Sequence, residues 1–341
     1  MSKSAAIVLI SVVATLSNSI SWGQGIGEEP SQTFGRVESL NLAPDVTASL
    51  KQSLQAHNYL SSQKILLIEV NKNPHSAPVL SFLGGVYFLS GDYWNAAIAW
   101  NKAAAITQLP PQLQFSLAMA YVRVGHQEWA RTVLELLAKT DPRNSLYPYW
   151  MGRLDYDIHD YNQALLHLKE AVRLDPDMAR AYDSLGLCYF SLNQNELAVE
   201  NYRKAIELDQ ASGRPEAWPY LNLAIALEFI NEPAEAETDL RKAMSLDPKL
   251  PQAHFQLGNL LERQEKIPEA THELLEASRL DSNYAEPHFV LARIYRKQGN
   301  RALSQQEVNT YLLLHAPAES PHSAPPPSQS SSPQNSTRPA N

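Results

Sequence analysis

The stretch from Ala181 to Leu208 constrains the fold of this chain more than any other part of the sequence. Its apolar residues recur at helical spacing in two blocks, which the polar triplet Asn193–Asn195 separates, so it predicts a helix, a tight turn and a second helix. Gly186 and Ala198 are small residues at positions where the two helices must approach closely. A helix pair this short is marginal in water, so it requires neighbours of the same kind.

The same pattern recurs along the chain with a period of 34 residues. It returns after a phase shift of four residues beyond the stretch described above, because the sequence from Ala211 to Glu216 inserts a break containing Gly and Pro. The small-residue positions of seven successive units are Gly84, Ala118, Gly152, Gly186, Ala224, Gly258 and Ala292. Prolines fall in predicted first turns or at unit ends, where a helix tolerates them.

The arrangement Tyr182, Leu185–Gly186, Tyr189, Ala198 and Tyr202 resembles the tetratricopeptide repeat, a helix–turn–helix unit of 34 residues. The resemblance covers about four fifths of the chain, from residue 43 to residue 316, and implies an all-α fold, a right-handed α-solenoid of about eight units. The predicted units start near residues 43, 77, 111, 145, 179, 217, 251 and 285.

The first 23 residues have the pattern of a secretory signal: Lys3, an apolar run from Ala5 to Leu16, and a small polar segment. The apolar run is shorter than the roughly 20 residues that span a bilayer, so we expect cleavage after Gly23 and a periplasmic or secreted protein. An uncleaved membrane anchor is the alternative.

Two further segments lack the repeat. Residues 24–42 have no clear period and predict a linker or a loosely docked arm. Residues 317–341 are rich in proline and serine with almost no large apolar side chain, which predicts a disordered tail.

No catalytic or cofactor motif is evident in the sequence. The net charge of −8 argues against a protein that binds the phosphate backbone of nucleic acids. The single cysteine, Cys188, predicts a buried apolar side chain rather than a nucleophile. His254 and His288 occupy equivalent positions in adjacent units, where a metal pair is the alternative to imidazoles that fill an aromatic position. We therefore expect no enzyme activity, no cofactor and no metal.

The resemblance implies that the first helices of the units line a concave face that binds a protein or peptide partner. Aromatic and arginine side chains are enriched at binding hot spots, and the predicted face is rich in both. The candidate partner-binding residues are Phe115, Arg123, Tyr149, Arg153, Tyr156, Phe190, Phe229 and Phe255. The two arginines suggest a ligand with an acidic group; packing between neighbouring first helices is the alternative role for each residue.

The C-terminal end of the repeat region suggests a second function. Leu312, Leu313 and Leu314 follow one another in the last predicted helix, and no polar helix covers them. A self-assembling structural module, which would form a homodimer through this helix, is therefore the alternative to a partner-binding scaffold.

Overall fold

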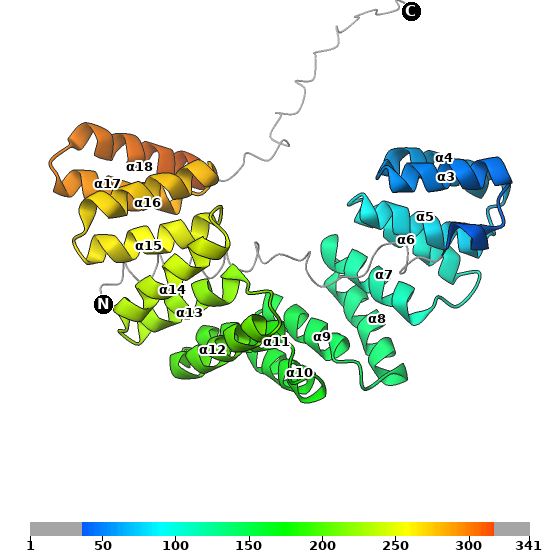
Figure 1. Cartoon of the computed structure of the whole chain (residues 1–341), viewed down its shortest axis with the longest axis horizontal. Helices are drawn as coiled ribbons and strands as arrows, with labels where there is room; N and C mark the ends of the chain where they lie inside the picture. Colours follow the sequence, from blue (N-terminus) through cyan, green and yellow to red (C-terminus); the bar gives the residue numbers. More distant parts are fainter. Residues whose placement is uncertain (1–35, 317–341) are drawn as a thin grey trace, which may run out of the picture. The chain divides into compact units, whose positions relative to one another are not determined.

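The computed structural model describes residues 36–316, and within that range all regular secondary structure is helical (Figure 1). Sixteen α-helices form eight helix–turn–helix pairs, which confirms the predicted all-α fold. The first helices of the pairs are α3 (Pro44–Gln55), α5 (Ala77–Leu89), α7 (Pro111–Arg123), α9 (Leu146–Asp157), α11 (Ala179–Ser191), α13 (Ala217–Phe229), α15 (Pro251–Arg263) and α17 (Glu286–Lys297). The second helices are α4 (Tyr59–Lys72), α6 (Tyr93–Ala104), α8 (Gln127–Thr140), α10 (Tyr161–Leu174), α12 (Asn195–Ala211), α14 (Pro233–Leu246), α16 (Ile267–Leu280) and α18 (Arg301–His315).

Two compact units divide the chain between Leu257 and Gly258, inside α15. In the first unit, each first helix packs against its own second helix, and that second helix packs against the next first helix. The helices α9 and α11 also contact each other directly, as do α11 and α13. Consecutive first helices of this unit therefore lie side by side.

Every turn between a first and a second helix contains one residue in the left-handed backbone region. These residues are His57, Gly91, Gly125, His159, Asn193, Asn231, Glu265 and Gly299. The amide that follows the left-handed residue donates to a carbonyl of the last helical turn, as Asp92 N does to Tyr87 O at 2.9 Å. This is the pattern of a Schellman C-cap, and it closes all eight pairs in the same way.

The two helices of a pair touch most closely at the small-residue positions. A Cβ atom added to Gly186 would lie 2.5 Å from Cε1 of Tyr202, and one added to Gly84 would lie 2.6 Å from the indole of Trp100. Tyr202 and Trp100 are fully buried on these glycines. The close contact of the helices therefore depends on the missing Cβ.

The segment before the first pair is ordered from residue 36. Val37–Leu40 forms a 3₁₀ helix, and the buried Leu40 packs with Leu50, Leu66 and Phe82. The end of the predicted linker is thus part of the hydrophobic core, because Leu40 gives it an apolar anchor. The rest of that segment, the predicted signal and the predicted tail lie outside the described residues.

The break between the fifth and sixth pairs does not shorten the preceding helix. α12 has 17 residues, whereas α10 and α14 have 14 each. It continues to Ala211 and stops only before Gly213, which has a left-handed φ of 71°. The inserted residues therefore extend the second helix by about one turn before the chain reverses.

None of the helices between residues 36 and 316 is both long enough and apolar enough to cross a membrane.

The close contact at Gly186 gives a stability prediction. Gly186→Ala should lower the free energy of unfolding by about 1–3 kcal/mol, because the new methyl group overlaps the Tyr202 ring. The third and sixth pairs already combine alanine with leucine at these positions, as Ala118 with Leu134 and Ala224 with Leu240. The double variant Gly186→Ala/Tyr202→Leu should therefore recover part of the loss. Chemical denaturation measures both; equal stability of Gly186→Ala and wild type would contradict the account.

Candidate partner-binding face

The candidate site is the side of α7, α9, α11 and α13 that carries most of the predicted binding residues, and we call it the first-helix face. Its side chains recur at intervals of three, four or seven residues, which places them on one side of each helix. The residues that define it are Phe115 on α7, Tyr149, Arg153 and Tyr156 on α9, Asp183 and Phe190 on α11, and Asn222 and Phe229 on α13.

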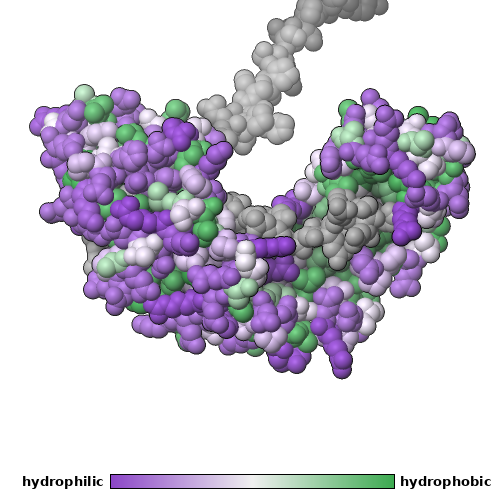
Figure 2. Space-filling model, in the orientation of Figure 1, coloured by the Kyte–Doolittle hydropathy of each residue, from purple (hydrophilic) through white to green (hydrophobic). Residues whose placement is uncertain are grey.

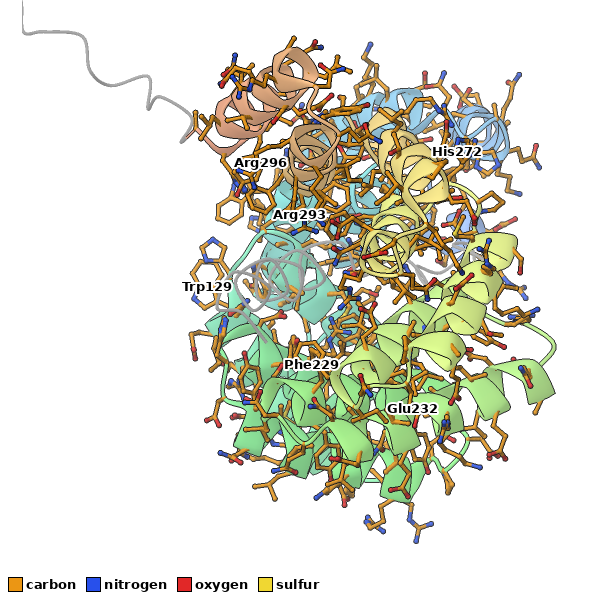
Figure 3. All side chains as sticks on the ribbon, turned by 90° about the vertical axis from the view of Figure 1, so that its left-hand side faces the viewer. Trp129, Phe229, Glu232, His272, Arg293 and Arg296 are labelled. Atoms are coloured by element: carbon orange, nitrogen blue, oxygen red, sulfur yellow. The ribbon has the colours of Figure 1, made fainter. Side chains whose placement is uncertain are left out.

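Two contacts join α11 to α13 across this face. Asn222 Nδ2 donates a hydrogen bond of 2.9 Å to Asp183 Oδ1. One side of the face thus has a polar pair, and an aromatic pair lies two helical turns further along. There the rings of Phe190 and Phe229 meet edge to face, with centroids 5.0 Å apart and both side chains partly exposed. Figure 3 shows the position of Phe229.

The contacts between α9 and α11 are more deeply buried. The guanidinium of Arg180 lies 5.0 Å from the centroid of the Tyr149 ring. Further along, Ser191 Oγ donates to Tyr156 Oη at 3.5 Å. Tyr149 and Tyr156 are both buried, and burial raises the pKa of Tyr156 to about 12. On this side of the face the tyrosines serve to pack the helices together.

Arg153 is buried between these two tyrosines and beside carboxyl groups. Burial opposes its charge, but Tyr149, Asp157 and Asp183 outweigh that effect and raise the pKa of the guanidinium. The charge of Arg153 is therefore directed at carboxyls of the protein itself. This arrangement does not support the expectation that Arg153 binds an acidic group of a ligand.

The remaining predicted residues lie in different surroundings. Phe115 is partly exposed and contacts the ring of Tyr147 at 6.0 Å between centroids. Arg123 is exposed at the end of α7, with its guanidinium 5.5 Å from the Tyr93 ring of the preceding pair. Phe255 is fully buried, so a ligand cannot reach it without a rearrangement, and it belongs to the core rather than to the face.

Carboxyl groups gather near one end of α11 and α13. Burial raises the pKa of Asp183 to about 6, against the Asn222 hydrogen bond and the charge of Arg153. Burial, followed by the charges of Glu216 and Asp183, raises the pKa of Asp209 to about 7. Burial also raises the pKa of Glu216, which Arg180 opposes. The periodicity of the sequence did not reveal this acidic group, because Asp209 and Glu216 belong to a helix end and a connecting loop.

The side chains considered for catalysis or metal binding have other roles. Cys188 is buried, and burial raises the pKa of its thiol to about 12, which disfavours the reactive thiolate. His254 Nε2 lies 3.1 Å from Pro248 O, and His288 Nδ1 lies 2.6 Å from Glu307 Oε2. Within residues 36–316, no group of three or more His, Cys, Asp or Glu side chains is arranged to hold a metal ion.

Comparison with known proteins confirms the repeats. Two tetratricopeptide-repeat family models match residues 177–249 and 221–285. The crystal structure of a tetratricopeptide repeat protein from Parabacteroides merdae aligns with 82% of this chain and 100% of its own, with a TM-score of 0.58 and 16% identity. At that identity the likeness shows the fold alone.

Curated relatives match over parts of their length. A DnaJ homolog subfamily C member 7 homolog of Dictyostelium discoideum is 25% identical over 171 residues, which is 47% of this chain and 32% of that protein. The human protein O-mannosyl-transferase TMTC3 is 33% identical over 106 residues, which is 30% of this chain and 11% of that protein. The chain thus spans a third or less of these two relatives. Tetratricopeptide repeats are generally non-catalytic scaffolds that bind proteins or peptides.

The acidic group gives a prediction on pH. In the folded state Asp209 holds its proton to about pH 7, whereas an unfolded aspartate loses it near pH 4, so this residue costs stability as the pH rises between those values. Asp209→Asn should remove the cost and stabilise the protein at pH 8 by about 1 kcal/mol, less than full linkage because the carboxyl is partly exposed. The gain should shrink toward pH 4. Denaturation at both pH values measures it.

Glu200→Gln, at an exposed position of the same helix, is the matched control and should change neither the stability nor its pH dependence. A stability gain for Asp209→Asn that is equal at pH 4 and pH 8 would show that the Asp209 carboxyl does not titrate as described.

Proposed function

We propose that this protein is an exported, non-catalytic tetratricopeptide-repeat scaffold that binds an extended segment of a peptide or protein on its first-helix face. The observation that carries the proposal is the partly exposed aromatic pair Phe190–Phe229 beside the polar pair Asp183–Asn222. Adjacent first helices contribute one residue to each pair. A ligand that runs across α11 and α13 would meet apolar rings and hydrogen-bonding groups in turn.

The charges of the face favour a ligand with a basic group rather than an acidic one. Arg153 is buried among carboxyls, while Asp183, Asp209 and Glu216 lie near one end of the face with Arg180 as the basic group that acts on Glu216. A lysine or arginine of the ligand would stabilise the ionised carboxylates, whose raised pKa values reflect their burial and mutual repulsion. An acidic ligand would add to that repulsion.

The apolar part of the ligand would contact the two phenylalanines. Phe190 and Phe229 are each partly exposed, so they have surface left to bury against a partner. Aromatic side chains of this kind, held in place by a neighbouring ring, lose little conformational freedom on binding and are frequent hot spots. The tyrosines of α9 support them from the neighbouring helix by fixing the position of α11.

The proposed location outside the cytoplasm rests on the sequence of residues 1–23, which lie outside the described part of the chain. Lys3 and the apolar run that follows are typical of a cleavable signal. Export predicts that the mature protein begins near Gln24. N-terminal sequencing of the protein from its native cells tests this, and a cytosolic protein that retains residues 1–23 would contradict it.

One observation favours self-assembly as a second candidate function. The side chains of Leu312 and Leu313 on α18 are 58% and 75% exposed, and none of the residues of this helix is buried. Two copies could cover these leucines by packing their last helices together. A molar mass in solution that doubles with protein concentration would favour this function over binding by a monomeric scaffold.

The binding proposal can be tested without knowing the natural partner. The full chain would be used to select from a phage-displayed library of random 12-residue peptides. The selected peptides should combine lysine or arginine with large apolar residues. The double variant Phe190→Ala/Phe229→Ala should bind them about 2 kcal/mol more weakly, close to thirtyfold in Kd, as the loss of a hot-spot pair does.

Asp183→Asn should weaken the binding of the basic peptides more than that of apolar peptides without a basic residue. Lys204→Ala, on the second helix α12, is the control and should bind like wild type. If the phenylalanine double variant keeps its fold and captures the peptides as well as the control does, the first-helix face is not the site.

A further inference from the structure

A cluster of aromatic rings lies where the second and third helix pairs make their turns, and we call Trp94, His126 and Trp129 the aromatic patch. The ring of His126 stacks on that of Trp129, with centroids 4.1 Å apart and planes within 9° of parallel. On its other side the ring centroid of Trp94 is 5.4 Å away. Three rings from two neighbouring pairs thus form one continuous surface.

The patch is exposed and is held from beneath. Trp94 and Trp129 are 47% and 48% exposed, and Figure 3 shows Trp129 projecting away from the ribbon. The buried Tyr121 meets the Trp129 ring edge to face at 5.3 Å. Its hydroxyl is bonded to the side-chain amide of Asn101, which donates at 2.7 Å and accepts at 3.0 Å. The indole of Trp129 is therefore positioned by contacts on its inner edge while its outer part remains in water.

The repeat itself does not require aromatic residues at these positions. Residues one or two periods away from Trp94 include Leu60, Glu128 and Asn162, and those at the position of Trp129 include Asn95 and Gln163. Most of the visible surface is hydrophilic, as Figure 2 shows. Two half-exposed tryptophans in such a surface indicate a binding site, because packing does not account for them.

His126 also departs from a local rule of helix capping. At the same position, Asp92 and Asp160 accept a hydrogen bond from a backbone amide in the first turn of α6 and α10. His126 makes no such side-chain bond at the start of α8, and its ring stacks on Trp129 instead. The chain thus has an aromatic surface where a helix cap would otherwise stand, and departures of this kind concentrate at functional sites.

The chemistry of the patch favours a proline-rich ligand. The patch is flat and apolar, and it has no carboxylate or ammonium group, so it offers little to a charged ligand. Proline-rich segments bind to aromatic surfaces because their extended backbone is already formed and their rings pack flat on indoles. This chain has such a segment: residues 317–341 include seven prolines, three of them consecutive at Pro325–Pro327, and only one acidic and one basic side chain, Glu319 and Arg338.

We propose that the aromatic patch binds the proline-rich segment of this same protein, with Pro325–Pro327 on the rings of Trp94 and Trp129. The nearly neutral segment matches the uncharged patch, and the segment continues the chain directly after α18. Binding would cover the two indoles and give the segment a defined place. This site is separate from the first-helix face, and its test is independent of the proposed function.

The test uses a fluorescent peptide with the sequence of residues 317–341, the full chain, and a chain that ends at Ala316 and so keeps all sixteen described helices. The shortened chain should bind the peptide about tenfold more tightly than the full chain, whose own segment competes. Trp94→Ala/Trp129→Ala in the shortened chain, and a peptide with Pro325–Pro327 changed to serine, should each weaken binding about tenfold or more. Leu136→Ala, an exposed position on the same helix as Trp129, is the control and should have no effect.

Circular dichroism and melting temperature establish that each variant is folded before its binding is compared. Equal binding by the folded tryptophan double variant and the control would overturn the proposal, as would equal binding by the full and shortened chains. A peptide that keeps the three prolines but has all flanking residues replaced, and that binds as well as the original, would overturn the assignment to this segment. Binding lost only when the tryptophans or the prolines are changed supports it.

Discussion

The close approach of two helices over a missing Cβ is the contact on which the rest of this structure depends. In the fourth, fifth and seventh pairs a glycine of the first helix lies against a large side chain 16 residues later, as Gly186 does against Tyr202. Because the contact recurs with the repeat, it fixes the same crossing of the helices in successive pairs. Burial of Trp100, Tyr202 and the equivalent leucines then provides most of the apolar core between the helices.

This contact uses only one side of each first helix, so the opposite side can vary without loss of the fold. In the first compact unit that variation produces the first-helix face, where tyrosines, phenylalanines and carboxyls follow one another on α9, α11 and α13. It also produces the aromatic patch at the turns of two earlier pairs. Both surfaces combine partly exposed aromatic rings with a rigid support beneath them, which lowers the entropy lost when a ligand binds.

The helical pairs could be predicted from the sequence because a period repeated in phase along most of the chain leaves few alternatives. The same repetition showed that His57 and His159 are turn residues, and the structure gives both the left-handed backbone of the turn. The docking of Leu40 was not predicted, since a single apolar residue in a polar segment has no period. The binding face was predicted in part: Phe190 and Phe229 are partly exposed, but Arg153 and Phe255 are buried.

The reason for that difference is physical. Helical periodicity gives the side of a helix on which a residue lies, but not how closely the next helix covers it. Nor does it give the charges that other elements bring near, and so Arg153 was predicted to meet a ligand whereas Asp157 and Asp183 are its neighbours. The contacts Asp183–Asn222 and Trp129–His126 also depend on the arrangement of consecutive pairs or on a turn, which the period alone does not specify.

The most direct test of the central claim is photo-crosslinking in intact cells. A photoreactive amino acid would replace Phe229 on the first-helix face in one version of the full chain and Lys204 on the second helix α12 in another. The account predicts that the version labelled at residue 229 forms a crosslink to a partner and that the version labelled at residue 204 does not. Crosslinks of equal yield from both positions, or from residue 204 alone, would contradict the claim that the first-helix face is the binding site.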